Sequence, residues 1–505
     1  MSPAPGFPRL FALCLVPFAL LATMNSAGYR FGASDQAFYA PAVLKAIDPA
    51  LYPRDSSLIR SQARLTLVDD VVGPVLRRMS IPLPAAFAAM QAAALALLAA
   101  AGLLVAAVLY RTSWSGAALL AALTLRHAIS QSGTNTLEGY FHPRQLAFAL
   151  GAIAAAAYLR GQRALPIALV LAAGAFHPTT ALWFLLWLGA ALLVRDRHGR
   201  YLPTSTLAIG IAAAIAAGWA LTAGPLQGRL TRMDAAWLAT LASKDYLFPL
   251  EWPATTWAIN LAYLPIVVLI YRSRRRAGVA VPAEAGLVAG CVLLVAVFLA
   301  LLPFNAARVA LAIQLQPARV FWLLDFFAVV YVVWGIAESA AAARSPARSS
   351  TSLRAGAVAA LLTVASIARG AYVMFVEFPE RRLVQASITD DDWGRAMAWA
   401  RGSDRRSGWL AHPQHAVKYG TSLRVAGQRD VFVEAIKDGA VGMYDRAIAL
   451  RTRDRVQALG DFETLSAARA LTLAGEYDLD YLITEQTLEL PEAFRSGTLR
   501  VYRLR

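Results

Sequence analysis

The 505-residue sequence is poor in cysteine and in charged residues. Its two cysteines, Cys14 and Cys291, both lie in apolar runs, and the chain has no CxxC motif. A disulfide framework and a cysteine-based metal or redox site are therefore excluded. Only 16% of the residues are charged and 58% are hydrophobic, whereas soluble proteins carry about 25% charged residues. This shortage of charge excludes a soluble enzyme and predicts a membrane protein.

Acidic residues are scarcer than basic ones, with 32 Asp and Glu against 48 Lys and Arg and a formal net charge of +16. Most of the excess lies before Phe378, and the tail that follows is close to neutral. The sequence lacks the interleaved basic and aromatic residues of a nucleic-acid binder and the charge rings of a channel. We therefore interpret the positive excess as a signal of membrane topology and expect no nucleic-acid partner.

Long apolar runs are abundant in the first three quarters of the chain. A membrane-crossing helix needs about 20 such residues, so the runs predict about eleven transmembrane helices. Their approximate ranges are 8–27, 84–110, 113–130, 143–159, 163–180, 180–195, 204–223, 254–271, 282–303, 319–339 and 355–377. The first is interpreted as an uncleaved span, because Pro17 interrupts it and no clear signal-peptide cleavage site follows.

Several short loops between these runs carry arginine. The clusters are Arg111; Arg160 and Arg163; Arg195, Arg197 and Arg200; Arg272 and Arg274 to Arg276; and Arg344, Arg348 and Arg354. If the runs cross the membrane alternately, all of these clusters fall on the same side, which the positive-inside rule assigns to the cytoplasm. The chain is thus predicted to cross the membrane several times, with the N-terminus in the cytoplasm and the C-terminal region outside.

The sequence changes character near residue 379. Residues 1–378 predict an all-α polytopic membrane domain with a long first external loop at 28–82. That loop is expected to form amphipathic helices on the membrane surface, for example at 39–47. Residues 379–505 combine mixed charge, short strand-like runs and helical stretches. They predict a soluble extracytoplasmic α/β domain.

Polar residues collect in the loops of the predicted outer side. The seven that we single out are Asp35, Gln36, Glu138, His142, Arg144, His177 and Arg319. Ionisable groups at membrane depth usually line a water-filled site, so one interpretation is a shared cavity. In the other, Asp35 caps the helix that follows it, the histidines bind backbone carbonyls, and the arginines reach lipid headgroups.

If these side chains share a cavity, their types suit glycosyl transfer from a lipid-linked phosphate. A carboxylate would act as a general base on an incoming hydroxyl, or would hold a divalent Mg or Mn ion together with a second acid and a histidine. The candidate catalytic residues, and candidate metal ligands, are Asp35, Glu138 and His142. The candidate substrate-binding residues are Gln36, Arg144, His177 and Arg319, because the fork of arginine donors matches a phosphate.

Two motifs carry a family resemblance. "SDQAFY" (34–39) places an acid after the first span, and "LEGYFHPR" (137–144) places a second in the next external loop. With the polytopic layout and the tail, these resemble the GT-C superfamily of membrane glycosyltransferases. The resemblance implies a GT-C-like fold, a polyprenyl-phosphate-linked sugar as donor, and transfer on the outer face of the cytoplasmic membrane.

A second hypothesis keeps the fold without the catalysis, since a fold does not fix a function. The protein would then bind or handle lipid-linked glycans in envelope biogenesis. A transporter is disfavoured, because the sequence shows no internal repeat and its polar residues gather at one face instead of the midplane.

Overall fold

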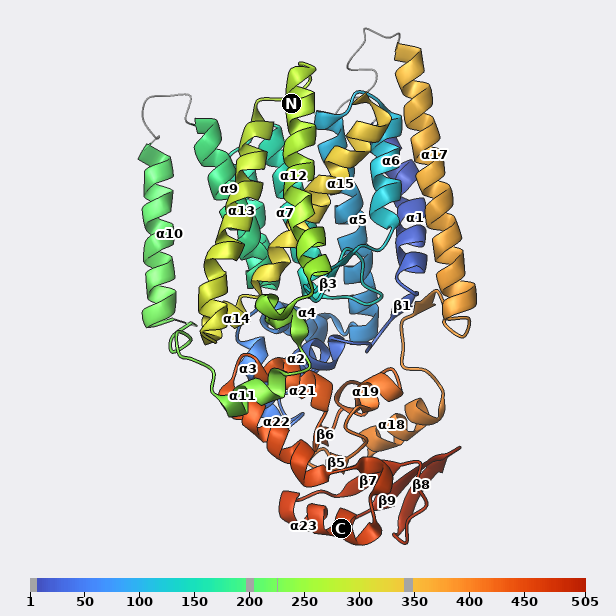
Figure 1. Ribbon diagram of the computed structural model, residues 1–505. Coiled ribbons are helices and arrows are strands. Elements are labelled where there is room, and N and C mark those ends of the chain that lie inside the picture. Colours follow the sequence, from blue (N-terminus) through green and yellow to red (C-terminus); the bar gives the residue numbers. More distant parts are fainter. Residues whose placement is uncertain (1–6, 197–203, 225, 340–347) are drawn as a thin grey trace.

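The computed structural model describes residues 7–196, 204–224, 226–339 and 348–505 (Figure 1). Long helices run side by side in a bundle, and short helices and strands gather at one end of it, which we call the tail end. The bundle helices are α1 (Phe7–Asn25), α5 (Leu83–Leu109), α6 (Ser113–Thr124), α7 (Pro143–Leu159), α8 (Ala164–Phe176), α9 (Pro178–Asp196), α10 (Thr204–Thr222), α12 (Ala254–Arg276), α13 (Ala283–Ala306), α15 (Val320–Ala337) and α17 (Arg348–Tyr372). Helices thus overlap every predicted apolar range.

Six helices within the described ranges are long and apolar enough to cross a membrane. They are Leu83–Leu109, Pro178–Arg195, Ala254–Arg276, Ala283–Ala306, Ala310–Ala337 and Thr351–Glu377. The protein is therefore a helical membrane protein. The sequence predicted more crossings because several apolar runs fold as shorter helices: α6 ends at Thr124, before Arg126 and His127, and α8 ends at Phe176, before Pro178.

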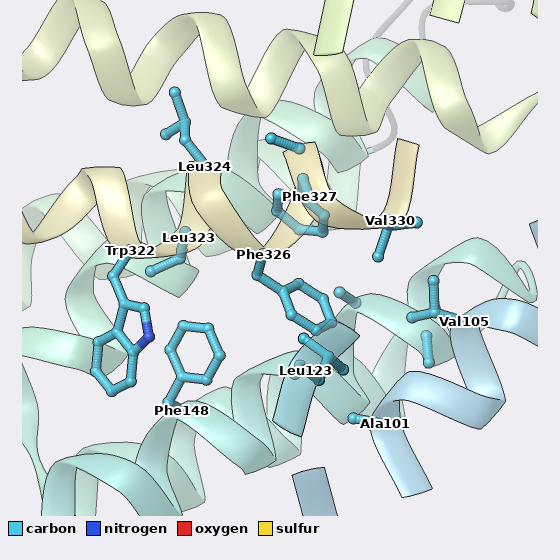
Figure 2. Close-up of a cluster of buried hydrophobic side chains, with 14 of the residues drawn as sticks. Ala101, Val105, Leu123, Phe148, Trp322, Leu323, Leu324, Phe326, Phe327 and Val330 are labelled. Carbon is cyan, nitrogen blue, oxygen red and sulfur yellow. The ribbon is translucent and has the colours of Figure 1, made fainter. Parts of the chain in front are cut away.

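Aromatic packing holds the centre of the bundle together. Phe148 on α7 stacks on Trp322 of α15, with ring centroids 4.0 Å apart, and the ring of Phe326 meets Phe148 edge-on at 5.9 Å (Figure 2). All three side chains are almost fully buried. Such ring pairs add about 0.5–1.5 kcal/mol each beyond the area that they bury. They fix α15, which follows Arg319, against α7, which follows His142.

The first external loop folds into a short strand and three helices. They are β1 (Tyr29–Arg30), α2 (Gln36–Ile47), α3 (Ser56–Ala63) and α4 (Val68–Met79). The prediction that residues 39–47 lie on the membrane as an amphipathic helix is wrong, because α2 is largely buried beneath α4 and α20. The exposed apolar stripe lies instead on and beside α4. Its residues, four apart in sequence, are Leu67, Val71, Val75 and Met79.

The tail, residues 379–505, contains the small sheet that the sequence predicted. Its elements are β4 (Val384–Gln385), α18 (Asp392–Gly402), β5 (Gly408–Leu410), α19 (His415–Lys418), α20 (Leu423–Ala426), β6 (Asp430–Val431), α21 (Ala435–Gly442), α22 (Arg446–Leu459), α23 (Ala467–Tyr477), β7 (Tyr481–Thr484), β8 (Glu492–Ser496) and β9 (Leu499–Arg503). The strand order is β6-β5-β7-β9-β8. Strand β5 runs parallel to β6 and β7, and β9 runs antiparallel to β7 and β8. Strand β8 was not predicted.

Two kinds of contact tie the tail to the first external loop. Strand β1 pairs in parallel with β4, so that Tyr29 lies opposite Val384. The buried guanidinium of Arg424 donates to Asp55 from Nε at 2.7 Å, and to Asp438 from both terminal nitrogens at 2.6 and 3.0 Å. The tail is therefore docked on the loop that carries Asp35.

Candidate functional site

A cavity of about 680 Å³ lies between the bundle and the tail. Its walls come from the first external loop, the hairpin of β2 (Ala128–Ile129) and β3 (Thr134–Asn135), the segments leading into α7 and α9, and α21 of the tail. Six of the seven predicted candidates line it: Asp35, Glu138, His142, Arg144, His177 and Arg319. Residues that are far apart in the sequence thus share one polar space.

Gln36 is the exception, and its prediction as a substrate-binding residue is wrong. Its side chain is fully buried. The amide nitrogen donates to the carbonyl oxygen of Phe141 at 3.0 Å, and the amide oxygen accepts from the backbone N–H of Gly32 at 2.6 Å. Gln36 therefore joins the first and second external loops and offers no group to the cavity.

Asp35 stands at the N-cap position of α2, but its side chain makes no capping hydrogen bond. Instead, Oδ1 accepts from Lys437 Nζ at 2.9 Å, and Oδ2 lies 3.4 Å from His142 Nε2 and 3.9 Å from an Arg144 nitrogen. Burial raises the pKa of this carboxyl, but Lys437, His142 and Arg144 outweigh burial and hold the pKa well below its usual range. Asp35 is thus an ionised carboxylate that faces the cavity.

Glu138 and Arg144 form a buried ion pair beside Asp35. Arg144 Nη2 lies 2.5 Å from Glu138 Oε1, and both side chains are almost fully buried. The carboxylate of Glu138, which was expected to serve as a second acid, is therefore already paired with Arg144. Glu138 thus holds Arg144 in place beside Asp35.

The predicted Mg or Mn site does not fit this arrangement. The carboxylates of Asp35 and Glu138 already face Lys437 and Arg144, which take the positions that a cation would need. Across the described ranges, no group of three or more His, Cys, Asp or Glu side chains has a geometry that could hold a metal ion.

The two His-Pro pairs begin helices, as proline at the first helical position favours. His142 Nδ1 accepts from the N–H of Arg144 at 3.1 Å, and His177 Nδ1 accepts from the N–H of Thr180 at 3.2 Å. An accepting Nδ1 places the proton of the neutral ring on Nε2, and His142 Nε2 faces Asp35. Both rings therefore line the cavity while capping a helix, and they accept from backbone N–H groups, whereas the alternative interpretation expected bonds to backbone carbonyls.

Burial, followed by the charge of Arg144, lowers the pKa of His142 to about 3. Burial, followed by Arg319, holds the pKa of His177 well below its usual range. Both imidazoles are neutral at pH 7. They can donate or accept hydrogen bonds there without adding charge to the cavity.

Acidification is expected to destabilise the protein through these histidines. A lowered pKa means that the folded chain binds fewer protons than the unfolded chain. The stability they contribute is thus fully present above the unfolded value of 6.5 and is lost as the pH falls toward about 3. The free energy of unfolding should fall by up to about 1.4 kcal/mol per pH unit for each histidine.

Melting temperatures of the purified protein between pH 7 and pH 4 test this expected fall in stability. His142→Gln should show a shallower fall, and an unchanged slope would contradict the assignment.

Arg319 is a buried cation that faces the same cavity. Its side chain is 7% exposed, and Nε is buried without a hydrogen-bond partner. In the part of the chain that the structure describes, no carboxylate forms an ion pair with it. A buried charge without a counterion is costly, so this guanidinium is suited to an anionic ligand.

A second cavity, of about 350 Å³, adjoins the first. The two share three residues, Tyr39, His177 and Tyr444. The second is lined mainly by apolar side chains: Leu65, Leu182, Leu226, Leu311 and Leu315, with Ala220 of α10. A mainly apolar space, suited to a hydrocarbon chain, thus borders the polar cavity at His177.

Lys437 is the site residue that sequence reasoning missed. It lies on α21, 402 positions from Asp35 in the sequence. Sequence reasoning did not place this lysine in the site, because only the docking of the tail brings it to the carboxylate. The loop at 226–253 also contributes Lys244, Asp245 and Tyr246 to the cavity.

Comparison with known protein families finds no matching family model. Comparison with curated proteins finds no match. What the protein does must therefore be argued from the site. The site joins an ionised carboxylate, two neutral histidines and a buried arginine without a counterion to an apolar cavity.

Proposed function

We propose that this protein is a GT-C-type glycosyltransferase that transfers a sugar from a polyprenyl-phosphate-linked donor to an acceptor hydroxyl, on the outer face of a bacterial inner membrane. The observation that carries the proposal is the placement of Arg319. A buried guanidinium without a counterion lines the same cavity as the ionised carboxylate of Asp35. These are the two charges that phosphate binding and hydroxyl activation require.

The donor would lie across the two cavities. Its phosphate would pair with Arg319, which removes the cost of an uncompensated buried charge. Its polyprenyl chain would occupy the apolar cavity beyond His177 and Tyr444. Its sugar would then lie on the other side of the phosphate, in the polar cavity beside Asp35.

In the transfer step the acceptor oxygen bonds to the anomeric carbon while the bond from that carbon to the phosphate oxygen breaks. The departing phosphate keeps the electron pair, and Arg319 stabilises its charge. Asp35 takes the proton of the acceptor hydroxyl. A carboxylate of low pKa suffices for this, because the hydroxyl becomes strongly acidic once its oxygen has bonded to the sugar. His142 and Lys437 orient the carboxylate.

The membrane topology is part of the proposal. In the proposed topology, the end of the bundle away from the tail faces the cytoplasm and the tail lies outside. In support, the end of α9, with Arg195, and the start of α17, with Arg348, lie at the end of the bundle away from the tail (Figure 1). The helix ends that carry Arg195 and Arg348 thus lie opposite the cavity.

One observation favours the non-catalytic alternative, a membrane protein that binds or handles lipid-linked glycans. The ion pair between Lys437 and Asp35 neutralises the carboxylate, as a purely structural contact would. Turnover by the purified protein separates the two functions, since a binder would hold the donor and release no polyprenyl phosphate.

Arg319→Gln is expected to weaken the binding of polyprenyl phosphate by about 10- to 100-fold, the loss typical of a charge-assisted hydrogen bond. Titration of the detergent-purified protein with a short-chain polyprenyl phosphate measures it. Arg308→Gln is the matched control, because Arg308 is more exposed and pairs with Glu251. Equal affinity in wild type and Arg319→Gln would contradict the placement of the donor.

A further inference from the structure

The polar cavity has a second basic region, which the proposed donor site does not use. We call it the arginine mouth: Arg30, Arg126 and Arg381. Arg30 belongs to β1, Arg126 follows α6, and Arg381 follows the helical turn Val373–Glu377 at the end of α17. Three segments that are distant in sequence thus each contribute one guanidinium to the same cavity.

The arginine mouth is short of counterions. Over the whole cavity, seven Arg and Lys side chains face four Asp and Glu. Within the described part of the chain, neither Arg30 nor Arg126 forms an ion pair. Arg381 lies 3.7 Å from the exposed carboxylate of Glu380 and stacks on the ring of Phe378. Glu377 is the one described carboxylate on this part of the cavity wall.

The fold brings two of these like charges, Arg30 and Arg381, close together. The backbone N–H of Arg30 donates to the carbonyl oxygen of Gly139 at 2.8 Å, beside Glu138. A Cβ at Gly139 would lie 2.5 Å from the carbonyl oxygen of Ser26, so only glycine lets the strand approach so closely. Pairing of β1 with β4 then brings Arg381 near. Burial, and next the charge of Arg381, lower the pKa of Arg30.

We propose that the arginine mouth binds a phosphate group carried by the acceptor, so that the acceptor is a phosphorylated molecule whose hydroxyl reaches Asp35. This inference rests on the proposed function. Arg319, beside the apolar cavity, is already assigned to the donor phosphate. A second anion would neutralise part of the charge of the remaining arginines, and their planar forks suit a phosphate. The acceptor phosphate itself stays unchanged, and only the hydroxyl loses its proton.

The phosphate could belong to a lipid headgroup or to a free sugar phosphate, and two probes separate these sources. Dihexanoyl phosphatidate carries the phosphate with acyl chains, and glycerol 3-phosphate carries it without them. Both would be titrated into the full-length protein in lipid nanodiscs, with glycerol as the neutral control. Tighter binding of phosphatidate that Arg319→Gln leaves unchanged would assign a lipid acceptor, and equal binding of the two probes would assign a soluble one.

The double variant Arg30→Gln/Arg126→Gln is expected to bind the better probe at least tenfold more weakly than wild type. It should also lose much of the salt dependence of that binding. Arg382→Gln is the matched control, because Arg382 is the exposed neighbour of Arg381 and does not line the cavity. Unchanged melting of the double variant shows that it folds, and if it does not fold, Arg30→Gln and Arg126→Gln are measured singly, each with an expected loss of at least threefold.

Failure of this inference and failure of the proposed function give different results. If wild type binds neither probe, or if the variants bind as wild type does, the acceptor site is overturned while the donor site is untouched. Arg319→Gln should leave probe binding unchanged and weaken only polyprenyl phosphate. If Arg319→Gln instead weakens the probe as much as the double variant does, the two phosphates share one site and the separate acceptor site is overturned.

Discussion

Asp35→Asn is expected to abolish sugar transfer, with a loss of about 10²- to 10⁴-fold in rate, the range that a positioned general base supplies. The amide keeps the shape of the carboxylate and can still accept from Lys437, so the fold should survive. It cannot take a proton from the acceptor hydroxyl. The test follows release of polyprenyl phosphate from lipid-linked sugars by mass spectrometry, using purified protein.

Asp48→Asn is the matched control for this variant. Asp48 lies in the same external loop, its side chain is partly exposed, and it pairs with Arg405 on the tail surface. Its loss should leave the rate within about twofold, because an exposed pair contributes only about 0–1 kcal/mol. Full activity of Asp35→Asn would show that Asp35 is not the general base. Wild-type protein that binds the donor without any turnover would favour the non-catalytic alternative.

The convergence of the site could be predicted because it depends on membrane depth. Asp35, His142 and His177 each adjoin an end of an apolar run, and charged or polar groups at that depth need either water or each other. If successive apolar runs cross the membrane in alternate directions, these ends lie at the same side of the membrane and at a similar depth. The same logic places Arg319, at the start of another run, near them.

Other features depended on tertiary contacts that leave no local pattern. The hydrophobic period of residues 39–47 suits a surface helix, but α4 covers α2. The two helices pack so closely that a Cβ added at Gly73 would lie only 2.6 Å from the Cβ of Ala46. The acids at 35 and 138 suit a metal, but each has a basic partner, Lys437 and Arg144. Sequence spacing indicates which carboxylates can lie close together. It does not indicate whether a metal ion or a basic side chain will pair with them.

Arg424→Ala is expected to destabilise the docked tail by about 3–5 kcal/mol, the usual cost of breaking a buried ion pair from one side. Arg424 is fully buried and pairs with Asp55 of the external loop and with Asp438 of α21, while Glu434 lies 3.5 Å away. Its removal would leave three carboxylates buried around an empty space. Thermal melting, with limited proteolysis of residues 379–391 as a report on undocking, measures the effect.

The comparison with Arg405→Ala makes this prediction specific. Arg405 also joins the tail to the first external loop, through a 2.8 Å contact with Asp48, but its side chain is 61% exposed. Its loss should therefore cost no more than about 1 kcal/mol. Because Lys437 precedes Asp438 on α21, undocking should also withdraw Lys437 from Asp35, so Arg424→Ala should lose transfer activity below its melting temperature. Equal effects of the two variants would show that burial of the Arg424 network does not hold the tail in place.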